Sequence, residues 1–228
     1  MINETKIKFC GLTNYNEVAF AYEKKIFWIG FIFVRGSPRF IEFVKTKEII
    51  NQFKNKLNFV GVFVNPNNDW IQSAMDAGIN YIQLHGEESI ERCKEIKKLF
   101  KIPIIKAIAI EREEDLKNLE IYNDVCDYFL LDKKNISNTG FNGGTGENFD
   151  WNIISRNKNW LNQFKPWILS GGLNINNIKE AIKITGTKAI DVSSGIEYNP
   201  GIKSIELMDL FVKKIYRKNS KVRKWNKK

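Results

Sequence analysis

The sequence predicts an α/β protein, a closed (β/α)8 TIM barrel that forms a single domain. Short runs rich in Ile, Val and Phe alternate with polar segments of helical period, and about eight such repeats follow one another without a linker. The β-rich runs show little alternation between polar and apolar residues, which is typical of strands buried on both faces. An open, doubly wound sheet is the alternative, but eight repeats of roughly 30 residues fit a closed barrel better.

The elements of this barrel are expected in a regular order. We expect strands over Lys6–Cys10, Trp28–Val34, Phe59–Val64, Asn80–Leu84, Pro103–Ile108, Asp127–Asp132, Trp167–Ser170 and Lys188–Ser193. We expect helices over Asn14–Lys25, Lys47–Lys56, Asp69–Ala77, Glu88–Phe100, Glu113–Ile121, Ile175–Ile184 and Ile205–Tyr216. These segments carry apolar residues at steps of three and four, with Lys and Glu opposite. Helix start signals stand at Asn14, at Asn67-Asn68-Asp69 and at Asn174.

The composition excludes several classes of protein. A hydrophobic fraction of 43% with 27% charged residues is ordinary for a folded globular protein and excludes a mostly disordered chain. No run of about 18 apolar residues appears, so no membrane span is expected. The first residues lack the pattern of a signal peptide, so we expect a cytoplasmic protein. Three widely spaced cysteines and a single histidine exclude a His-rich metal site, and no metal is expected.

The net charge of +10 is concentrated at the C-terminus. Residues 213–228 contain nine Lys or Arg and no acid, which leaves 27 basic and 26 acidic residues in the rest of the chain. We therefore expect a catalytic barrel over residues 1–212 and a basic helix end or tail over residues 213–228. The tail has two interpretations: a solvated, frayed helix end, or a segment that contacts RNA or acidic surfaces through phosphates.

Reacting groups of such barrels lie at the C-terminal ends of the strands and in the loops that follow. Three Gly-rich or Ser-rich turns follow the last three expected strands, at Gly143-Gly144-Thr145-Gly146, Gly171-Gly172 and Ser193-Ser194-Gly195. Glycine lets backbone N–H groups approach an anion closely, and the loops after strands seven and eight often hold a phosphate. These turns predict a phosphate site, although glycine also simply ends strands.

Cys10 and Asp132 stand at strand ends on the same expected face. A thiol can act as a general base when its pKa is lowered, and a carboxylic acid can donate a proton when burial raises its pKa. Cys10 could equally be a small buried hydrophobe, and Asp132 a helix cap or a satisfied loop carboxylate. The residues alone leave both interpretations open.

A set of segments in fixed order extends from residue 6 to about residue 212. They are Lys8–Thr13, Gly30–Phe33, Ser37–Arg39, Val60–Asn65, Gln83–Gly86, Leu130–Asp132, Gly143–Gly146, Phe149–Trp151, Ser170–Asn174, Asp191–Glu197 and Pro200–Lys203. With these segments the sequence closely resembles the phosphoribosylanthranilate isomerase family of tryptophan biosynthesis. Any one segment is weak evidence, but together they are highly specific.

The resemblance implies a (β/α)8 barrel and an Amadori rearrangement, the third step of tryptophan synthesis from chorismate. The implied substrate is N-(5-phosphoribosyl)anthranilate, and the product is 1-(2-carboxyphenylamino)-1-deoxyribulose 5-phosphate. Asp132 matches the general acid, which protonates the furanose ring oxygen, and Cys10 matches the general base, which takes the proton from C2. No cofactor is expected, because the iminium nitrogen of the opened sugar is itself the electron sink.

The resemblance also assigns substrate contacts. Arg39 matches the position that holds the anthranilate carboxylate, and Asp191 the position that orients a sugar hydroxyl. His85 is expected in the wall of the site, with a hydrogen-bonded structural histidine as the alternative, just as Arg39 could be a surface arginine. The phosphate is expected on backbone groups around Gly144, Gly146, Gly171, Gly172, Ser193, Ser194 and Gly195. Glu147 departs from the family pattern, in which Lys or another non-acidic residue often follows the Gly-Thr-Gly turn. A carboxylate at this position repels phosphate unless it points to solvent.

Two other functions remain as alternatives. The first is another sugar-phosphate isomerase on the same barrel; the histidine-pathway isomerase would need Asp in place of Cys10, and a metal-dependent epimerase would need several histidines. The second is nucleic-acid binding through the basic tail, which fits less well because it would not require the acid, base and anion-site set. The expected partner is a small phosphorylated molecule. Contacts with nucleic acid are expected to be limited to non-specific contacts of the tail. The chain is expected to be a monomer or a homodimer.

Overall fold

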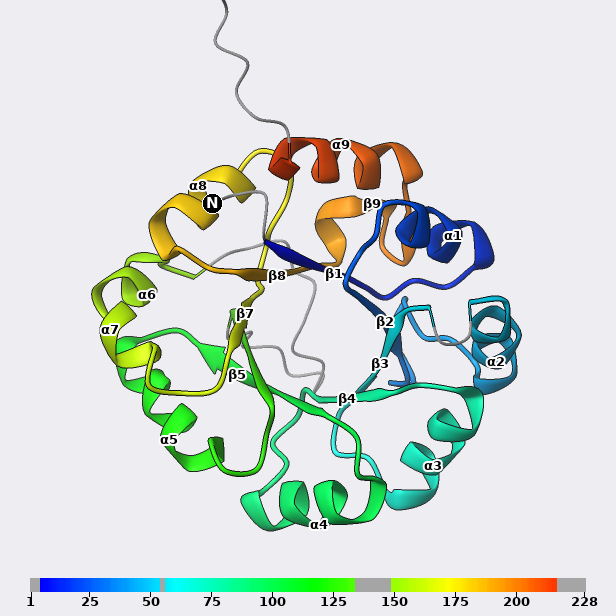
Figure 1. Ribbon diagram of the computed structural model, residues 1–228, viewed down its shortest axis with the longest axis horizontal. Coiled ribbons are helices and arrows are strands. Elements are labelled where there is room, and N and C mark those ends of the chain that lie inside the picture. Colours follow the sequence, from blue (N-terminus) through cyan, green and yellow to red (C-terminus); the bar gives the residue numbers. More distant parts are fainter. Residues whose placement is uncertain (1–4, 54–55, 134–148, 217–228) are drawn as a thin grey trace, which may run out of the picture.

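Eight parallel strands close into a barrel with helices around it (Figure 1) in the computed structural model, which describes residues 5–53, 56–133 and 149–216. The strands are β1 (Lys6–Cys10), β2 (Trp28–Ile32), β3 (Asn58–Phe63), β4 (Tyr81–Leu84), β5 (Ile104–Ile110), β6 (Tyr128–Lys133), β7 (Trp167–Leu169) and β8 (Ala189–Val192). Each strand pairs with the next, and β8 pairs with β1 in parallel. The predicted fold class is confirmed, and the open sheet is excluded.

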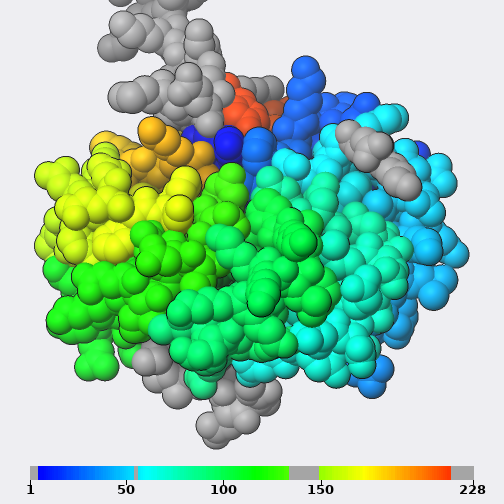
Figure 2. Space-filling model, turned by 60° about the horizontal axis from the view of Figure 1, so that its bottom comes forward, coloured from blue at the N-terminus to red at the C-terminus, as the bar shows by residue number. Residues whose placement is uncertain are grey.

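The helices follow one another around the barrel in chain order (Figure 1). They are α1 (Tyr15–Glu23), α2 (Phe43–Gln52), α3 (Asn68–Ala77), α4 (Ile90–Phe100), η2 (Glu113–Lys117), α5 (Asn118–Tyr122), α6 (Asn152–Arg156), α7 (Lys158–Leu161), α8 (Ile178–Thr185), η3 (Ser194–Ile196) and α9 (Ile205–Tyr216). A small antiparallel hairpin, β9 (Glu197–Asn199) and β10 (Ile202–Lys203), follows η3. Figure 2 shows the outer surface, where consecutive segments lie side by side from cyan through green to yellow.

Two of the three predicted helix starts are confirmed. The Asn14 side chain accepts a hydrogen bond from the Glu17 N–H (3.1 Å), and the Asn67 side chain accepts one from Trp70 N–H (2.8 Å). Asn174 is not a helix cap, because α8 begins only after Asn177 and the Asn174 side chain instead accepts from the Asn176 N–H.

One helix prediction is corrected by the structure, and two short helices are added to those predicted. The helix expected over Lys47–Lys56 begins earlier, at Phe43, and ends at Gln52. Its first turn lacks a side-chain cap, so the sequence carries no start signal there. Between β6 and β7 the structure adds α6 and α7, which span five and four residues and are too short to show a helical period.

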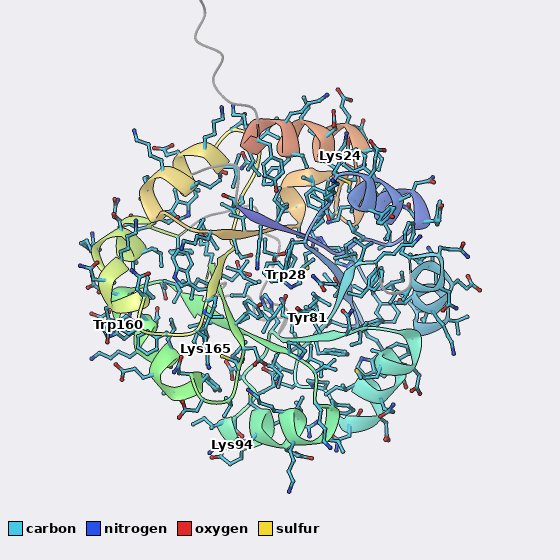
Figure 3. All side chains as sticks on the ribbon, in the orientation of Figure 1. Lys24, Trp28, Tyr81, Lys94, Trp160 and Lys165 are labelled. Atoms are coloured by element: carbon cyan, nitrogen blue, oxygen red, sulfur yellow. The ribbon has the colours of Figure 1, made fainter. Side chains whose placement is uncertain are left out.

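Alternation along the strands divides the core into two parts. On β1, Phe9 points outward and packs with the helices, whereas Cys10 belongs to a separate cluster inside the barrel. At the amino ends of β2, β4 and β6 this inner cluster ends in Trp28, Tyr81 and Tyr128, whose rings lie 5.4 Å (Trp28–Tyr128) and 6.5 Å (Trp28–Tyr81) apart. Figure 3 shows Trp28 and Tyr81 within the barrel ring. The amino end of the interior is therefore filled by aromatic side chains.

The expected boundary at residue 212 lies inside α9. Ile215 is buried, and the Tyr216 hydroxyl donates to the Thr5 carbonyl (3.0 Å), so residues 213–216 pack with the barrel. The rest of the basic segment, residues 217–228, lies outside the described residues. In the part of the chain that the structure describes, none of the helices is long and apolar enough to cross a membrane.

Candidate active site

A pocket opens at the carboxyl ends of the strands, the face opposite the aromatic cluster. It is lined by Cys10, Ile32, Val34, Arg39, Val62, Val64, Gln83, His85, Asp132, Ser170, Gly171, Gly172, Leu173, Asp191, Ser193 and Ser194. Nine of the twelve predicted site residues are in this lining. Gly195 is close by but does not line the pocket, and Gly144 and Gly146 lie outside the described residues.

Cys10 shares its side of the pocket with a buried ion pair. The Lys8 Nζ atom lies 2.8 Å from Asp191 Oδ1, and the Ser170 hydroxyl donates to Asp191 Oδ2 (3.3 Å). Burial raises the pKa of the Cys10 thiol, and the neighbouring Lys8 ammonium opposes this effect without cancelling it. Burial lowers the pKa of Lys8, but Asp191 and Cys10 together outweigh burial, so the pKa is raised and the ammonium stays charged.

A glycine on β2 leaves room for this arrangement. A Cβ atom on Gly30 would lie 2.9 Å from Cys10 Sγ and 3.2 Å from Lys8 Nζ. Gly30 pairs with Cys10 in the parallel register of β1 and β2. Both Gly30 and Lys8 were in segments that carried the resemblance, but the sequence assigned neither of them a role. The available signal for Lys8 was a lysine two residues before Cys10, on the same face of a strand and between the apolar residues Ile7 and Phe9.

Asp132 stands on the other side of the pocket, at the end of β6. Its Oδ2 atom lies 3.2 Å from His85 Nε2, and its Oδ1 atom accepts a hydrogen bond from the Lys133 N–H (2.8 Å). His85 Nδ1 in turn lies 2.8 Å from Gln83 Nε2. His85 is thus both a wall residue and a hydrogen-bonded histidine, so the two interpretations given above hold together. Gln83 was not recognised as a site residue from the sequence.

The acid and base candidates face the pocket from separate strands. Two strands, β7 and β8, stand between β6 with Asp132 and β1 with Cys10. Ser170 and Gly171, which follow β7, line the wall between them. A ligand seated in the pocket would therefore meet a thiol on one side and a carboxyl group on another, as two proton transfers at different atoms require.

Arg39 is buried and fixed by a carboxylate of the chain itself. Its Nε and Nη2 atoms donate to Glu197 Oε1 (2.7 Å) and Oε2 (2.8 Å), and Lys203 Nζ lies 2.6 Å from Glu197 Oε1. Burial raises the pKa of Glu197, but the bonds from Arg39 and Lys203 outweigh burial and hold it below its usual range. The alternative of a surface arginine is excluded. Among the described residues, Nη1 of Arg39 takes no part in the bonds to Glu197, and Arg39 lines the pocket.

The predicted phosphate corner combines two turns. Gly171 and Gly172 both adopt the left-handed region (φ 83° and 60°), which favours glycine. The Ser193 hydroxyl donates to the Cys10 carbonyl (3.1 Å), which ties this corner to β1. Gly195 has a packing role, since a Cβ atom there would lie 1.9 Å from the Leu173 carbonyl oxygen. Within the described ranges, no group of three His, Cys, Asp or Glu side chains could hold a metal ion.

Comparisons with known proteins agree with this geometry. The family model described as N-(5'phosphoribosyl)anthranilate (PRA) isomerase matches residues 7–214. The N-(5'-phosphoribosyl)anthranilate isomerase of Zymomonas mobilis is 36% identical over 211 residues, covering 92% of this chain and 97% of the relative. That of Rhizobium meliloti is 37% identical over 217 residues, covering 94% and 98%.

Solved structures give the same answer. The phosphoribosyl anthranilate isomerase of Thermotoga maritima is similar with a TM-score of 0.80 and 34% identity, covering 92% of this chain and 98% of that chain. A phosphoribosyl anthranilate isomerase in complex with reduced 1-(o-carboxyphenylamino)-1-deoxyribulose 5-phosphate is similar with a TM-score of 0.78, 32% identity and the same coverage. The chain belongs to the N-(5'-phosphoribosyl)anthranilate isomerase family.

Proposed function

We propose that this chain isomerises N-(5-phosphoribosyl)anthranilate to 1-(2-carboxyphenylamino)-1-deoxyribulose 5-phosphate, with Asp132 as general acid and Cys10 as general base. The observation that carries the proposal is the placement of these two residues on separate walls of one pocket, beside an arginine and a glycine-rich corner. Membership of the family supports the substrate and the place in tryptophan synthesis.

Asp132 starts the reaction by protonating the furanose ring oxygen, and the ring opens to an iminium ion. The carboxylate that remains receives the Lys133 N–H on Oδ1 and faces His85 Nε2 at Oδ2. Hydrogen bonds to the charged form stabilise it. The Lys133 N–H therefore stabilises the carboxylate that remains after proton transfer.

Cys10 completes the reaction by removing the proton from C2 of the opened sugar. The adjacent iminium ion acidifies that proton, so a modest base suffices. The Lys8 ammonium stabilises the thiolate that must form, against the effect of burial. The enolamine that results relaxes to the ketone of the product.

Binding is divided among the other residues of the pocket. The phosphate lies on backbone groups of Gly171 and Gly172 and on Ser193-Ser194, and the resemblance adds Gly144, Gly146 and Gly195 as further contacts. Arg39 holds the anthranilate carboxylate with the edge that Glu197 leaves open. Asp191, oriented by Lys8 and Ser170, accepts a sugar hydroxyl. A relative crystallised with a reduced phosphorylated product analogue supports a small phosphorylated ligand.

The setting of the enzyme is also part of the proposal. We place it in the cytoplasm, as a monomer or homodimer; one Thermotoga maritima relative is described as dimeric. Residues 1–212 carry the catalysis, residues 213–216 complete the packing of α9, and the basic residues 217–228 are dispensable for it.

The test is turnover of freshly generated phosphoribosylanthranilate, followed by loss of its fluorescence and without added metal. We expect activity in the parent and a fall in kcat of about 10²- to 10⁴-fold in Cys10→Ala and in Asp132→Asn, both folded. A folded parent without turnover would overturn the substrate, and an active parent with unaffected variants would overturn the roles of the two residues. Deletion of residues 217–228 should leave the rate nearly unchanged.

A further inference from the structure

The hairpin formed by β9 and β10 turns two charged side chains toward the interior. Lys203 pairs with Glu197 across the hairpin, so the two side chains lie on the same face. Both are buried, whereas the side chains of Tyr198 and Ile202 are exposed. The inner face of the hairpin is therefore an ion pair. Lys203 ends the last segment that carried the resemblance, but the sequence assigned it no role.

The hairpin holds Arg39, the residue proposed to bind the substrate carboxylate. Arg39 Nε and Nη2 donate to the two carboxylate oxygens of Glu197 (2.7 and 2.8 Å). The aliphatic part of Arg39 packs on Gly11, where a Cβ atom would lie 2.8 Å from Arg39 Cδ. The turn of the hairpin packs on the residue before Arg39, since a Cβ atom on Gly201 would collide with the Pro38 carbonyl oxygen. The hairpin thus fixes the backbone and the side chain of Arg39 together.

Lys203 also reaches the turn after β8. Its Nζ atom donates to the Ser193 carbonyl (3.0 Å), to the Ser193 hydroxyl oxygen (3.2 Å) and to Glu197 Oε1 (2.6 Å). These three acceptors match the three N–H groups of an ammonium. The Ser193 hydroxyl in turn donates to the Cys10 carbonyl (3.1 Å). One side chain therefore connects the wall that carries Arg39 with the turn proposed to hold the phosphate.

Packing alone does not account for a lysine at this position. Burial lowers the pKa of Lys203, and Glu197 opposes this effect without cancelling it. Replacement of a buried ion pair by apolar side chains of similar volume is often neutral or stabilising. Among the described residues, Arg39 and Ser193 line the pocket, whereas Lys203 is outside its lining. The ammonium therefore acts on the pocket through the two residues that it bonds, Glu197 and Ser193.

We propose that Lys203 is a positioning residue that fixes Arg39, through Glu197, relative to the Ser193 turn, and so sets the preference of the site for a ligand that carries both a carboxylate and a phosphate. The inference rests on the proposed substrate and on the proposed binding roles of Arg39 and of the phosphate corner. The two anionic groups are at opposite ends of that substrate. A fixed distance between their binding groups therefore favours a ligand of matching length.

Two compounds measure the two ends of the site separately. One is reduced 1-(o-carboxyphenylamino)-1-deoxyribulose 5-phosphate, and the other is the same compound with a phenylamino group that lacks the carboxylate. Calorimetry gives the Kd of each compound without turnover. The ratio of the two Kd values reports the carboxylate at Arg39, and the Kd of the carboxylate-free compound reports the phosphate end. In the parent we expect a ratio of about 100-fold, as a charge-assisted pair provides.

Lys203→Met removes the ammonium, keeps the length of the side chain and leaves Glu197 paired with Arg39. We expect the ratio to fall about tenfold and the carboxylate-free compound to bind about tenfold more weakly, because both ends lose their common anchor. In turnover, KM should rise at least about tenfold while kcat stays within about threefold of the parent, since the lost interactions bind substrate and transition state alike.

The two partners of Lys203 provide variants that should change one end only. Glu197→Gln should lower the ratio and retain the Kd of the carboxylate-free compound. Ser193→Ala should weaken both compounds equally and retain the ratio. The matched control is Lys106→Met, which breaks a buried ion pair with Glu88 below the loop that follows β4 and should change neither value.

The outcomes separate this inference from the proposed function. A folded Lys203→Met protein that retains both values, or loses only one of them, would overturn the inference, and so would equal losses in Lys106→Met. If thermal unfolding shows that Lys203→Met does not fold, parent values in Glu197→Gln or in Ser193→Ala overturn it instead. A parent that binds neither compound would overturn the proposed function and this inference with it. A parent that binds both with the expected ratio supports the proposed function, whichever result Lys203→Met gives.

Discussion

The amino end of the barrel interior is filled by Trp28, Tyr81 and Tyr128, whereas toward the carboxyl end it holds the buried ion pair of Lys8 and Asp191. Burial of aromatic rings stabilises the folded state, whereas burial of charged groups destabilises it unless they are paired. The same strands therefore carry residues that stabilise the barrel at one end and residues that cost stability at the other. This difference indicates that the polar end is retained for chemistry, and substitutions can separate the two contributions.

The largest effect on stability is expected at the amino end. Trp28→Ala removes the largest fully buried side chain and leaves a cavity between the rings of Tyr81 and Tyr128. We expect a loss of about 3 to 5 kcal/mol in the free energy of unfolding. Because Trp28 does not line the pocket, kcat of the folded fraction should stay within about twofold of the parent. Denaturant unfolding and turnover on the same preparation measure both, and a large fall in kcat would contradict the separation.

The second effect concerns the ion pair of the carboxyl end. Lys8→Met leaves Asp191 buried without its ammonium partner, and we expect a loss of about 3 kcal/mol in unfolding free energy. The double variant Lys8→Met with Asp191→Asn should regain part of that loss, since no unpaired charge then remains. Denaturant unfolding of the three proteins measures the coupling. Strict additivity of the two substitutions would contradict a direct interaction.

Lys8→Met should also shift the pH dependence of kcat/KM. Burial raises the pKa of Cys10, Lys8 counteracts that rise, and Asp191 adds to it. Removal of the ammonium therefore raises the pKa of the thiol further, so the ascending limb of kcat/KM should move to higher pH. The control is Lys106→Met, which breaks a second buried ion pair, with Glu88, away from Cys10. A limb that moves equally in both variants would indicate general loosening of the barrel.

These residues show what the sequence could and could not predict. The eight strands were predicted because their apolar runs are local signals, and the fold places the ends of parallel strands together. Cys10 and Asp132 were therefore expected on one face, and both line the pocket. The roles of the individual side chains there stay predictions until variants are measured.

The sequence could not predict which side chains pair when they are far apart along the chain. Lys8 meets Asp191 over 183 positions, and Arg39 meets Glu197 over 158, so no local pattern reports either pair. A lysine inside a strand reads as an edge or surface residue until its partner is known. The bonds of Gln83 depend on side-chain orientation at the strand end, which residue spacing does not give.

A smaller effect is expected where the phosphate corner meets the acid. Gly171 has φ of 83°, and a Cβ atom there would lie 3.1 Å from Asp132 Oδ1 and 3.0 Å from the Lys133 nitrogen. Gly171→Ala should cost about 1 to 2 kcal/mol of stability through backbone strain. It should also lower kcat by displacing the carboxyl group, and by less than the roughly 10²-fold that loss of the acid would give. Thermal unfolding and turnover report the two effects.

The control for this substitution is Gly186→Ala at the end of α8. Gly186 also has a positive φ (67°), but a Cβ atom there would meet only the flexible end of the Lys158 side chain. It should show a similar loss of stability with an unchanged kcat. Equal losses of kcat in the two variants would contradict a specific contact with Asp132.

The smallest effect is expected in acid, at Glu197 on the wall with Arg39. The pKa of Glu197 lies below its usual range in the folded chain, because the bonds from Arg39 and Lys203 outweigh burial. The unfolded chain therefore binds this proton more readily, so the stabilisation is present above the ordinary carboxyl range and is lost as the pH falls through the folded pKa.

Glu197→Gln lacks this contribution, and its unfolding free energy should decrease less between neutral and acid pH than that of the parent. Urea unfolding over that pH range measures the difference, with the exposed Glu120→Gln on α5 as the control that should follow the parent. Identical slopes in all three proteins would mean that Arg39 and Lys203 do not stabilise the Glu197 carboxylate, and the anchored arginine edge proposed for the substrate would then lose its physical basis.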